Sequence, residues 1–362
     1  MKYFASTLLA TAILASTALA AASEHGQVHA PALRRNNVHN KKRTSCSSSS
    51  KKGKKKSHHK SSSKSSASKS SSTNNDSSSS KDTSSSKSSS SSNSSSSTGG
   101  YSGSGKSLSL KGKQGLAWPN ANGMDIDNFF IGDVDWYYSW GATPGWSSAP
   151  TDKVFCPMLW GDNGSGGNAA EFKSKVTDDP NGTYNKWKCA MGMNEVNQAG
   201  QSDMSPAHAC SLMKEYIMPL AEKDWYIIGP STTSDPAGLT TWYKEFMSSC
   251  SDVFDRLDAV AVHYYDVNVE DFKKYVANWH KVTGKDIWIT EAACQNFNGG
   301  AQCSASQART FLTEMMSWVA DQDYVKAYAP FGAMQNLQGV SEVNRLSQGS
   351  NPTSLFKAFA SA

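Results

Sequence analysis

After its first residues, the 362-residue sequence has no run of the roughly 18 consecutive apolar residues that a membrane-spanning helix needs. An apolar segment stands at the start, residues 1–20, but it is too short to span a membrane. It begins with Lys2 and ends on Ala18-Leu19-Ala20, and this order of a cation, an apolar core and small residues is typical of a signal peptide. We therefore predict a secreted protein, extracellular or associated with a cell wall, with no membrane span.

Motifs for metals and nucleotides are also missing. The sequence has no Cys-x-x-Cys pair and no Cys/His cluster with zinc spacing. No Gly-x-Gly-x-x-Gly and no phosphate-binding loop motif follows an expected strand. We therefore expect no metal site and no cofactor.

Large apolar residues are scarce in residues 21–106, which consist mainly of serine and lysine. Such a segment cannot bury enough surface to offset the entropy lost on ordering, so we predict a disordered tail. The basic pairs Arg34-Arg35 and Lys41-Lys42 are typical of propeptide processing near its start. Three roles remain open for the tail: an O-glycosylated stalk, a contact with anionic wall polymers, or a solvated spacer.

Acidic residues are scarce in the same tail, which holds 16 basic and 3 acidic residues, whereas residues 107–362 hold 19 basic and 28 acidic residues. The formal net charge of +5 therefore averages a basic tail and an acidic domain. Because the positive charge lies where no core can form, and no aromatic residue interleaves it before Tyr101, we expect no nucleic-acid partner. An acidic domain suits a neutral substrate better than an acidic one.

Six of the seven cysteines lie in the acidic region, and six cysteines in a secreted domain predict up to three disulfides. Of the possible pairs, Cys294 with Cys303 is favoured because the two bracket a loop rich in glycine and asparagine. Glycosylation sequons begin at Asn163 and Asn181 in expected loops, so we also predict a glycoprotein.

Strand-like and helix-like segments alternate along residues 107–362, a region close to the roughly 250 residues typical of a single α/β barrel. The expected strands are Gln114–Trp118, Val134–Trp140, Val154–Trp160, Lys188–Glu195, Trp225–Pro230, Leu257–Tyr265, Asp286–Glu291 and Val325–Phe331. The expected helices are Asn168–Val176, Pro206–Ala221, Leu239–Ser249, Val269–Val282 and Ser304–Asp321. We therefore predict an α/β fold, a (β/α)8 TIM barrel that acts as a monomer.

The carboxyl ends of the strands carry the chemistry of such a barrel. Glu195 ends the fourth expected strand and Glu291 ends the seventh. A carboxylic acid and a carboxylate can together cleave a glycosidic bond, and a separation of about 5–5.5 Å leads to retention through a covalent intermediate. Further candidate substrate-binding residues lie at strand ends: Trp140, Trp160, Asn194, His263, Tyr265 and Phe331.

Several of these segments together resemble glycoside hydrolase family 128, the fungal β-1,3-glucanases of the alkali-sensitive-linkage group. The matching stretches are Gly115-Leu116-Ala117-Trp118-Pro119-Asn120, Pro157-Met158-Leu159-Trp160-Gly161, Gly192-Met193-Asn194-Glu195-Val196-Asn197, Gln201-Ser202-Asp203-Met204-Ser205, Ala261-Val262-His263-Tyr264-Tyr265 and Trp288-Ile289-Thr290-Glu291-Ala292. They follow one another in order over nearly the whole domain, and this ordered set carries the resemblance.

The resemblance implies roles for three residues. Glu195 falls on the acid/base of the family, Glu291 on its nucleophile and Asn194 on a residue that contacts the sugar 2-hydroxyl. Val196 departs from the family, which usually has proline after the acid/base. Valine keeps an N–H group and a less restricted backbone, so we expect a modest effect on the geometry of the turn.

The remaining candidates have a structural alternative beside the functional one. His263 and Tyr265 share one strand face, where they would bind substrate or orient Glu291; alternatively, His263 is a hydrogen-bonded histidine of the barrel core. Trp140 and Trp160 are candidate sugar platforms or packing residues of loops, and Phe331 is a weaker candidate platform. Trp288 has the opposite strand parity from Glu291 and is expected to face a helix.

We predict a secreted retaining glycoside hydrolase that cleaves β-1,3-glucan internally in fungal cell walls, with β-glucan as its partner and Glu195 and Glu291 as catalytic residues. Two alternatives remain open. One is a wall glucan-binding protein with weak or no catalysis, and the other is a glycosidase for another β-glycan linkage.

Overall fold

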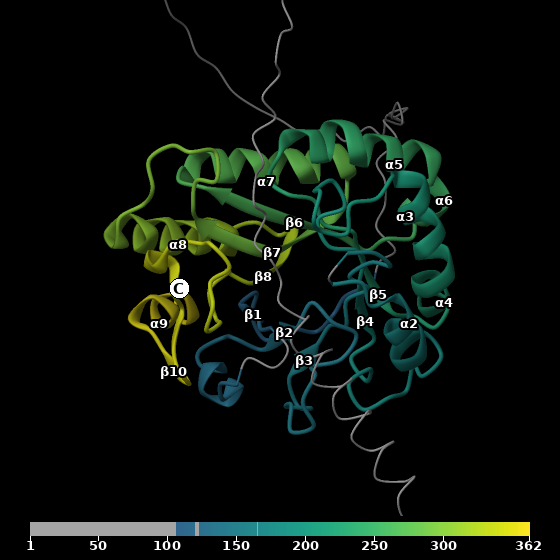
Figure 1. Ribbon diagram of the computed structural model, residues 1–362, viewed down its shortest axis with the longest axis horizontal. Coiled ribbons are helices and arrows are strands. Elements are labelled where there is room, and N and C mark those ends of the chain that lie inside the picture. The colour runs from purple at the N-terminus through teal and green to yellow at the C-terminus, as the bar shows by residue number, and fades with distance from the viewer. Residues whose placement is uncertain (1–105, 120–122, 165) are drawn as a thin grey trace, which may run out of the picture. The chain divides into compact units, whose positions relative to one another are not determined.

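Parallel strands form the centre of the structure, a computed structural model that describes residues 106–119, 123–164 and 166–362 (Figure 1). The first sheet contains β1 (Gly115–Ala117), β2 (Trp136–Tyr138) and β3 (Val154–Phe155). The second contains β4 (Cys189–Met191), β5 (Tyr226–Gly229), β6 (Ala259–Asp266), β7 (Asp286–Cys294) and β8 (Val325–Tyr328). The predicted signal peptide, the predicted tail as far as residue 105, Cys46, Asn120 and Ser165 lie outside the described residues.

The strands of each sheet are neighbours in chain order and all pair in parallel. Two isolated parallel bridges lie at the borders of the sheets: Gln114 pairs with Tyr328, and Met158 pairs with Met191. Each of the eight strands falls within or overlaps one of the expected segments. The mixed α/β fold with parallel sheets is thus confirmed.

The helices lie around the strands in Figure 1, and the expected helical segments are helical, although π-helical turns interrupt three of them. Their bounds are α2 Ala169–Phe172, η2 Lys173–Thr177, α3 Pro206–Leu212, η3 Met213–Ile217, α4 Met218–Ala221, η4 Gly238–Tyr243, α5 Lys244–Ser249, α6 Ser251–Phe254, α7 Val269–Thr283 and α8 Ala305–Ala320. Short elements that the sequence did not indicate are η1 Ile126–Phe129, η5 Glu342–Asn344, α9 Ser354–Ala360 and the antiparallel pair β9 Ser347–Gln348 and β10 Asn351–Pro352.

Side chains at the helix starts explain where several helices begin. The Ser205 hydroxyl accepts the N–H of His208, and Pro206 occupies the first turn of α3, where a missing N–H costs nothing. Ser304 and Gln307 form a reciprocal capping box at the start of α8. Local sequence therefore fixes these boundaries.

Two buried hydrophobic clusters lie on opposite faces of the strands. One cluster packs the strands against the helices. The other, which we call the inner cluster, contains residues of strands and loops only, including Trp136, Tyr138, Trp140, Tyr265 and Trp288. The face of the strands that belongs to the inner cluster is also the face on which the candidate site lies.

Trp288 belongs to the inner cluster, so the expectation that it faces a helix was wrong, although it is fully buried. The cause is an irregularity in β7. Val262 of β6 pairs with Ile289 and His263 pairs with Glu291, which leaves Thr290 without a partner in the ladder. Because one residue is skipped, Trp288 and Glu291 point to the same face despite their opposite parity.

Candidate active site

Glu195 and Glu291 come together beside His263 on the inner face of the five-stranded sheet. One carboxylate oxygen of each glutamate and one ring nitrogen of the histidine all lie within 4.8 Å of one another. All three side chains are buried, with 3% exposure or less. The structure therefore joins two strand ends that are 96 positions apart in the sequence, as the numbering of the two glutamates shows.

Glu291 lies within β7, and both of its carboxylate oxygens accept hydrogen bonds. The Trp140 indole Nε1–H donates to Oε1 at 2.8 Å, and the Tyr265 hydroxyl donates to Oε2 at 2.6 Å. Burial raises the pKa of Glu291, whereas the neighbouring His263 and these two donors lower it, with a net rise. Two donors on one carboxylate favour its ionised form and fix its orientation.

Glu195 lies beyond the end of β4, where the backbone leaves the regular strand. Its φ of 45° is in the left-handed region, which a non-glycine residue rarely occupies. Oε1 lies 2.9 Å from His263 Nδ1, and Oε2 is a buried oxygen without a hydrogen-bond partner. Burial raises the pKa of Glu195 from 4.5 to about 8, so this carboxyl group holds its proton at neutral pH.

His263 lies between the two glutamates on β6. Its Nδ1 is 2.9 Å from Glu195 Oε1 and 3.5 Å from Glu291 Oε2, and its Nε2 is buried without a partner. Burial lowers the pKa of His263, which keeps the imidazole neutral. A neutral imidazole can share a proton with Glu195 without placing a positive charge between the carboxyl groups.

Aromatic rings surround Glu291. Trp140, which has a φ of 55°, packs against Tyr138 at 4.8 Å between ring centroids and against Phe331 at 6.1 Å. Phe331 also packs against Tyr265 at 5.9 Å. Trp140, Tyr265 and Phe331 are each 5% exposed or less, so they form a buried wall around the carboxylate. The sequence predicted Trp140 as a sugar platform or a packing residue of loops, and a hydrogen bond from its indole could not be inferred from its position at a strand end.

Trp160 and Asn194 lie on the side of Glu195. Trp160 is buried beneath the glycine-rich loop after β3, because Cβ atoms built on Gly164 and Gly166 would lie 3.3 Å and 2.4 Å from its indole ring. The Asn194 amide donates to Gln201 Oε1 at 3.2 Å, and its Oδ1 is buried without a partner. An unpaired buried acceptor is costly unless a ligand or water supplies the donor.

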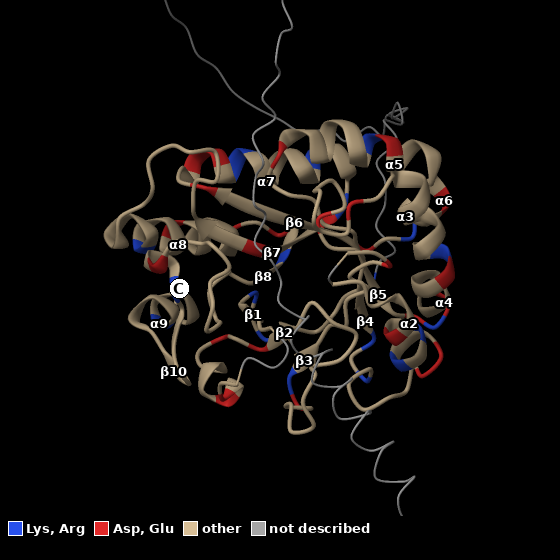
Figure 2. Ribbon diagram, viewed as in Figure 1, with Lys and Arg blue, Asp and Glu red and all other residues tan. Residues whose placement is uncertain are grey.

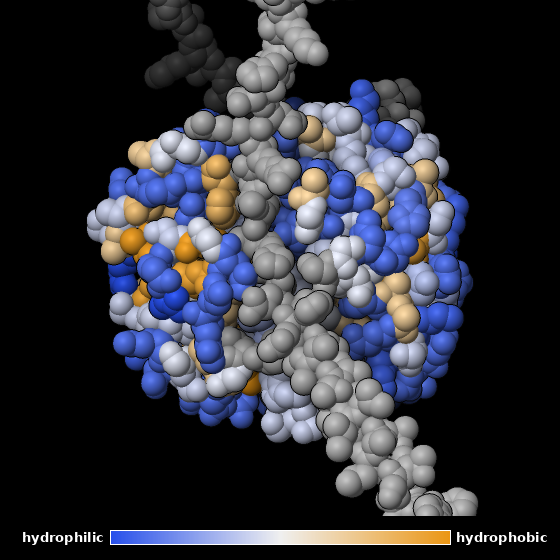
Figure 3. Space-filling view, in the orientation of Figure 1, coloured by the Kyte–Doolittle hydropathy of each residue, from blue (hydrophilic) through white to orange (hydrophobic). Residues whose placement is uncertain are grey.

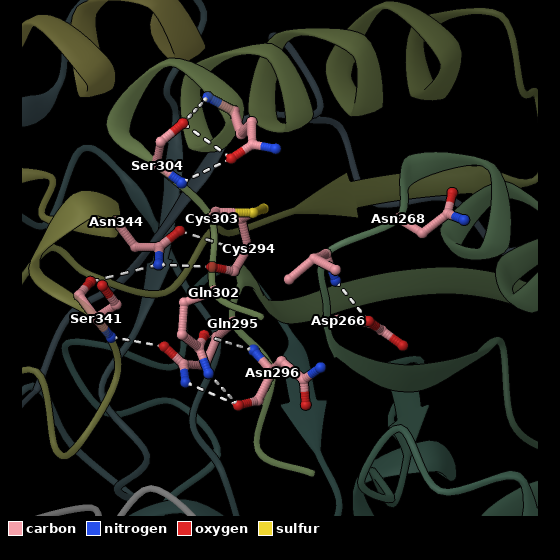
Figure 4. The surroundings of a disulfide bond; sticks show 12 residues. Asp266, Asn268, Cys294, Gln295, Asn296, Gln302, Cys303, Ser304, Ser341 and Asn344 are labelled. Atoms are coloured by element: carbon pink, nitrogen blue, oxygen red, sulfur yellow. Dashed lines mark hydrogen bonds between the residues drawn. A yellow bond between two sulfur atoms is a disulfide. The ribbon is translucent and has the colours of Figure 1, made fainter. Parts of the chain in front are cut away.

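A disulfide closes the loop after β7, and this loop packs on the same wall. Cys294 and Cys303 are bonded, as predicted, and the other pairs are Cys156 with Cys189 and Cys210 with Cys250. Figure 4 shows the loop between Cys294 and Cys303, where the Gln302 side chain bonds to the backbone N–H and C=O of Asn296. The next residue, Phe297, packs on Tyr265 at 5.4 Å between ring centroids.

Asn344 holds the base of the same loop. Its Oδ1 accepts the N–H of Cys294 at 3.0 Å, and its Nδ2 donates to the Cys294 carbonyl at 3.0 Å (Figure 4). A disulfide and a two-sided amide contact therefore fix the chain three residues after Glu291.

Two groups of potential metal ligands occur among the described residues. The first combines Cys210 and Cys250 with Asp252, but a disulfide occupies both sulfur atoms. The second is the Glu195, His263 and Glu291 group, in which both Glu291 oxygens, Glu195 Oε1 and His263 Nδ1 already have protein partners.

The outer surface differs from this buried site. Charged residues of both signs are spread over the outer helices in Figure 2, and hydrophilic residues predominate on the face seen in Figure 3. No helix within the described ranges is long and apolar enough to cross a membrane.

Comparison with known proteins identifies relatives of this chain. The family described as glycosyl hydrolase catalytic core matches residues 115–359. Alkali-sensitive linkage protein 1 of Schizosaccharomyces pombe is 28% identical over 246 residues, which cover 66% of this chain and 42% of that protein. The chain thus spans less than half the length of this relative.

Two solved structures share the fold. A GH128 subgroup III curdlan-specific exo-β-1,3-glucanase from Blastomyces gilchristii, in complex with glucose, is 27% identical, with 69% of this chain and 98% of that chain covered and a TM-score of 0.54. A GH128 subgroup VII oligosaccharide-binding protein from Cryptococcus neoformans is 24% identical, with 72% and 96% covered and a TM-score of 0.58. These matches confirm the resemblance to glycoside hydrolase family 128.

Proposed function

The chain belongs to the glycosyl hydrolase catalytic core family, and from this premise we propose that it is a retaining hydrolase of β-1,3-glucan in fungal cell walls. One observation carries the proposal. Two buried carboxyl groups lie with oxygens within 4.8 Å of each other, and burial raises the pKa of both, but two hydrogen-bond donors oppose that rise at Glu291. An inverting mechanism requires room for a water molecule between the two carboxyl groups, and this short separation leaves none.

The proposed reaction has two steps. Glu195 donates its proton to the glycosidic oxygen as the C–O bond breaks, and Glu291 attacks the anomeric carbon to form a covalent glycosyl ester. The ionised Glu195 then takes a proton from water, whose oxygen attacks the same carbon and releases Glu291. The hydrogen bonds from Trp140 and Tyr265 orient the Glu291 carboxylate for attack.

Substrate would contact residues that have unused polar atoms or apolar faces. Asn194 Oδ1 supports a role as acceptor for the sugar 2-hydroxyl, because it is buried and has no protein partner. Trp140, Tyr265, His263 and Phe331 would line the subsite around Glu291, and Trp160 would contact sugar only if the glycine-rich loop above it moves.

The same proposal includes a closed (β/α)8 barrel as scaffold. The bridges Gln114–Tyr328 and Met158–Met191 support it, because they link the two sheets at both of their borders. In a closed barrel of this kind, catalytic residues gather at the carboxyl ends of the strands, where Glu195 and Glu291 lie. Secretion through the predicted signal peptide, the domain bounds 107–362, the monomeric state, glycosylation and wall attachment through the tail are further parts of the proposal.

The test is digestion of a soluble laminarin-type β-1,3-glucan by the purified protein. We expect reducing sugar to be released with the β-configuration at the first instant, as followed by proton NMR; initial α-product or no product would overturn the retaining assignment. Because a structural relative is named as an exo-enzyme, the size distribution of early products also tests our prediction of internal cleavage.

A glucan-binding protein without catalysis is the second candidate, favoured by the fold shared with the oligosaccharide-binding protein of C. neoformans. Retention on insoluble β-1,3-glucan without release of soluble sugar would support it. β-1,4-Mannan and β-1,6-glucan in the same assay test the alternative linkages.

A further inference from the structure

Glu195 is a buried, non-glycine residue in the left-handed region, and its carboxyl group lies close to that of Glu291. We propose that Ser231 is the positioning residue that holds this turn, because its hydroxyl and its carbonyl bind the N–H groups of Glu195 and Val196. The inference rests on the proposed role of Glu195 as acid/base and deepens it.

Ser231 follows β5 and holds the chain after β4 through three consecutive contacts. Its N–H donates to the Met193 carbonyl at 2.9 Å, its Oγ accepts the Glu195 N–H at 3.0 Å, and its carbonyl accepts the Val196 N–H at 3.1 Å. Ser231 is 1% exposed, so water does not compete for these bonds. One residue therefore satisfies two successive N–H groups of the turn.

The need for a hydroxyl follows from how β4 ends. In a regular parallel strand, successive N–H groups point alternately to the two neighbouring strands. Asn194 N–H still bonds to Trp160 on the side of β3, but Glu195 and Val196 both turn toward Ser231. Since the carbonyl already binds Val196, the serine hydroxyl supplies the acceptor that the buried N–H of Glu195 would otherwise lack.

Two neighbours agree with this arrangement. A Cβ atom on Gly192 would lie 2.8 Å from the backbone nitrogen of Pro230, so glycine allows the chain after β4 to approach the end of β5 closely. Val196, which stands where the family usually has proline, uses its N–H to bind Ser231. The turn is thus tethered by a hydrogen bond where a proline ring would restrict it.

The test measures kcat/KM of the Ser231→Ala variant on two substrates. β-1,3-Glucan needs the proton from Glu195 on its leaving oxygen. A 2,4-dinitrophenyl glycoside of a β-1,3-linked oligosaccharide does not, because dinitrophenolate leaves without being protonated. We expect kcat/KM on glucan to fall roughly 30-fold and kcat/KM on the aryl glycoside to change by less than about threefold, because only acid catalysis is lost. An equal loss on both substrates, or no loss on glucan, would overturn the proposal.

Three further variants keep the result interpretable. Ser231→Thr retains the hydroxyl and should recover most of the activity on glucan, whereas Ser231→Cys keeps the size but has a weak acceptor and should behave like the alanine variant. Thr233→Val is the matched control, since Thr233 bonds to the Asn197 side chain in the same loop and should leave the ratio of the two kcat/KM values unchanged. If alanine prevents folding, the cysteine variant decides.

A carbon-13 NMR titration of the Glu195 carboxyl separates this inference from the proposed function. In Ser231→Ala the carboxyl group should leave its buried position, and its pKa should fall toward the ordinary range. If the pKa of Glu195 falls in Ser231→Ala but the wild-type protein hydrolyses no glucan, the positioning role is retained and the glycosidase is rejected. If the pKa is unchanged in Ser231→Ala and the wild-type protein hydrolyses glucan, the positioning role is rejected and the glycosidase is retained.

Discussion

The ends of β4 and β7 each present one glutamate to the same site, but they hold it in different ways. Glu291 lies inside β7, which continues to Cys294, and two side-chain donors bind its carboxylate. Glu195 lies four residues after β4 ends, in a left-handed turn, and its Oε2 has no partner. Hydrogen bonds thus oppose the effect of burial on the pKa of Glu291, whereas burial raises the pKa of Glu195 to about 8.

Under the proposed function, this difference prepares Glu291 as the nucleophile and Glu195 as the acid. A nucleophile must stay ionised and aligned, which two hydrogen-bond donors to its carboxylate favour. A general acid must keep its proton and later release it, which a buried carboxyl group with a high pKa provides. Each of the following experiments removes one side of this contrast.

The largest effect is expected for Glu291→Gln. Glutamine keeps the size of the side chain but cannot form the glycosyl ester, so kcat should fall on the order of 10⁴-fold or more on glucan and on an aryl glycoside alike. Binding of β-1,3-linked oligosaccharides should persist in isothermal titration calorimetry. Activity within tenfold of the wild type would assign the nucleophile to another residue.

A smaller effect is expected for Tyr265→Phe, which removes one donor from Glu291. Without this hydrogen bond the pKa of Glu291 should rise further, so the acid limb of the profile of kcat/KM against pH should move to higher pH. We expect kcat to fall about 10- to 100-fold. Tyr138→Phe is the matched control, because the Tyr138 hydroxyl donates to the Thr290 carbonyl and its loss should leave the acid limb in place.

The smallest effect is expected for the Tm of Glu195→Gln. Its pKa is raised from 4.5 to about 8, so the folded protein keeps a proton that the unfolded chain releases, and stability is lost as pH rises from about 4.5 to about 8. Glu195→Gln removes this loss, and its Tm should exceed that of the wild type by about 3 °C or more at pH 8. Near pH 4 the two proteins should melt together, and a difference of equal size at both pH values would contradict a protonation effect.

Much of the architecture was predictable because local patterns determine it. Apolar runs alternating with helical periodicity located all eight parallel strands, and the helix expected to begin at Pro206 begins there in the structure. The pairing of Cys294 with Cys303 was predicted because the two bracket a loop rich in glycine and asparagine. These features depend on residues close together in the chain, so the sequence contains the information directly.

The geometry of the site was harder to predict from the sequence than the architecture. The predicted strand Lys188–Glu195 ends at Met191 in the structure, and Glu195 lies in a left-handed turn beyond it. The parity rule placed Trp288 on the wrong face, because Thr290 is skipped in the pairing with β6. Both errors arise where a strand departs from its period of two residues.

The sequence by itself indicated which strands carry glutamates and favoured one cysteine pair, Cys294 with Cys303, whereas the structure supplied the other two pairs. Only the tertiary structure decided that Trp140 and Tyr265 bind Glu291, that Glu195 lacks such donors, and that the Ser231 hydroxyl meets the turn at Glu195. The physical reason is that burial and hydrogen bonding between neighbouring strands set the direction and the pKa of a side chain. The partners in those bonds are 26 to 151 residues apart in the chain.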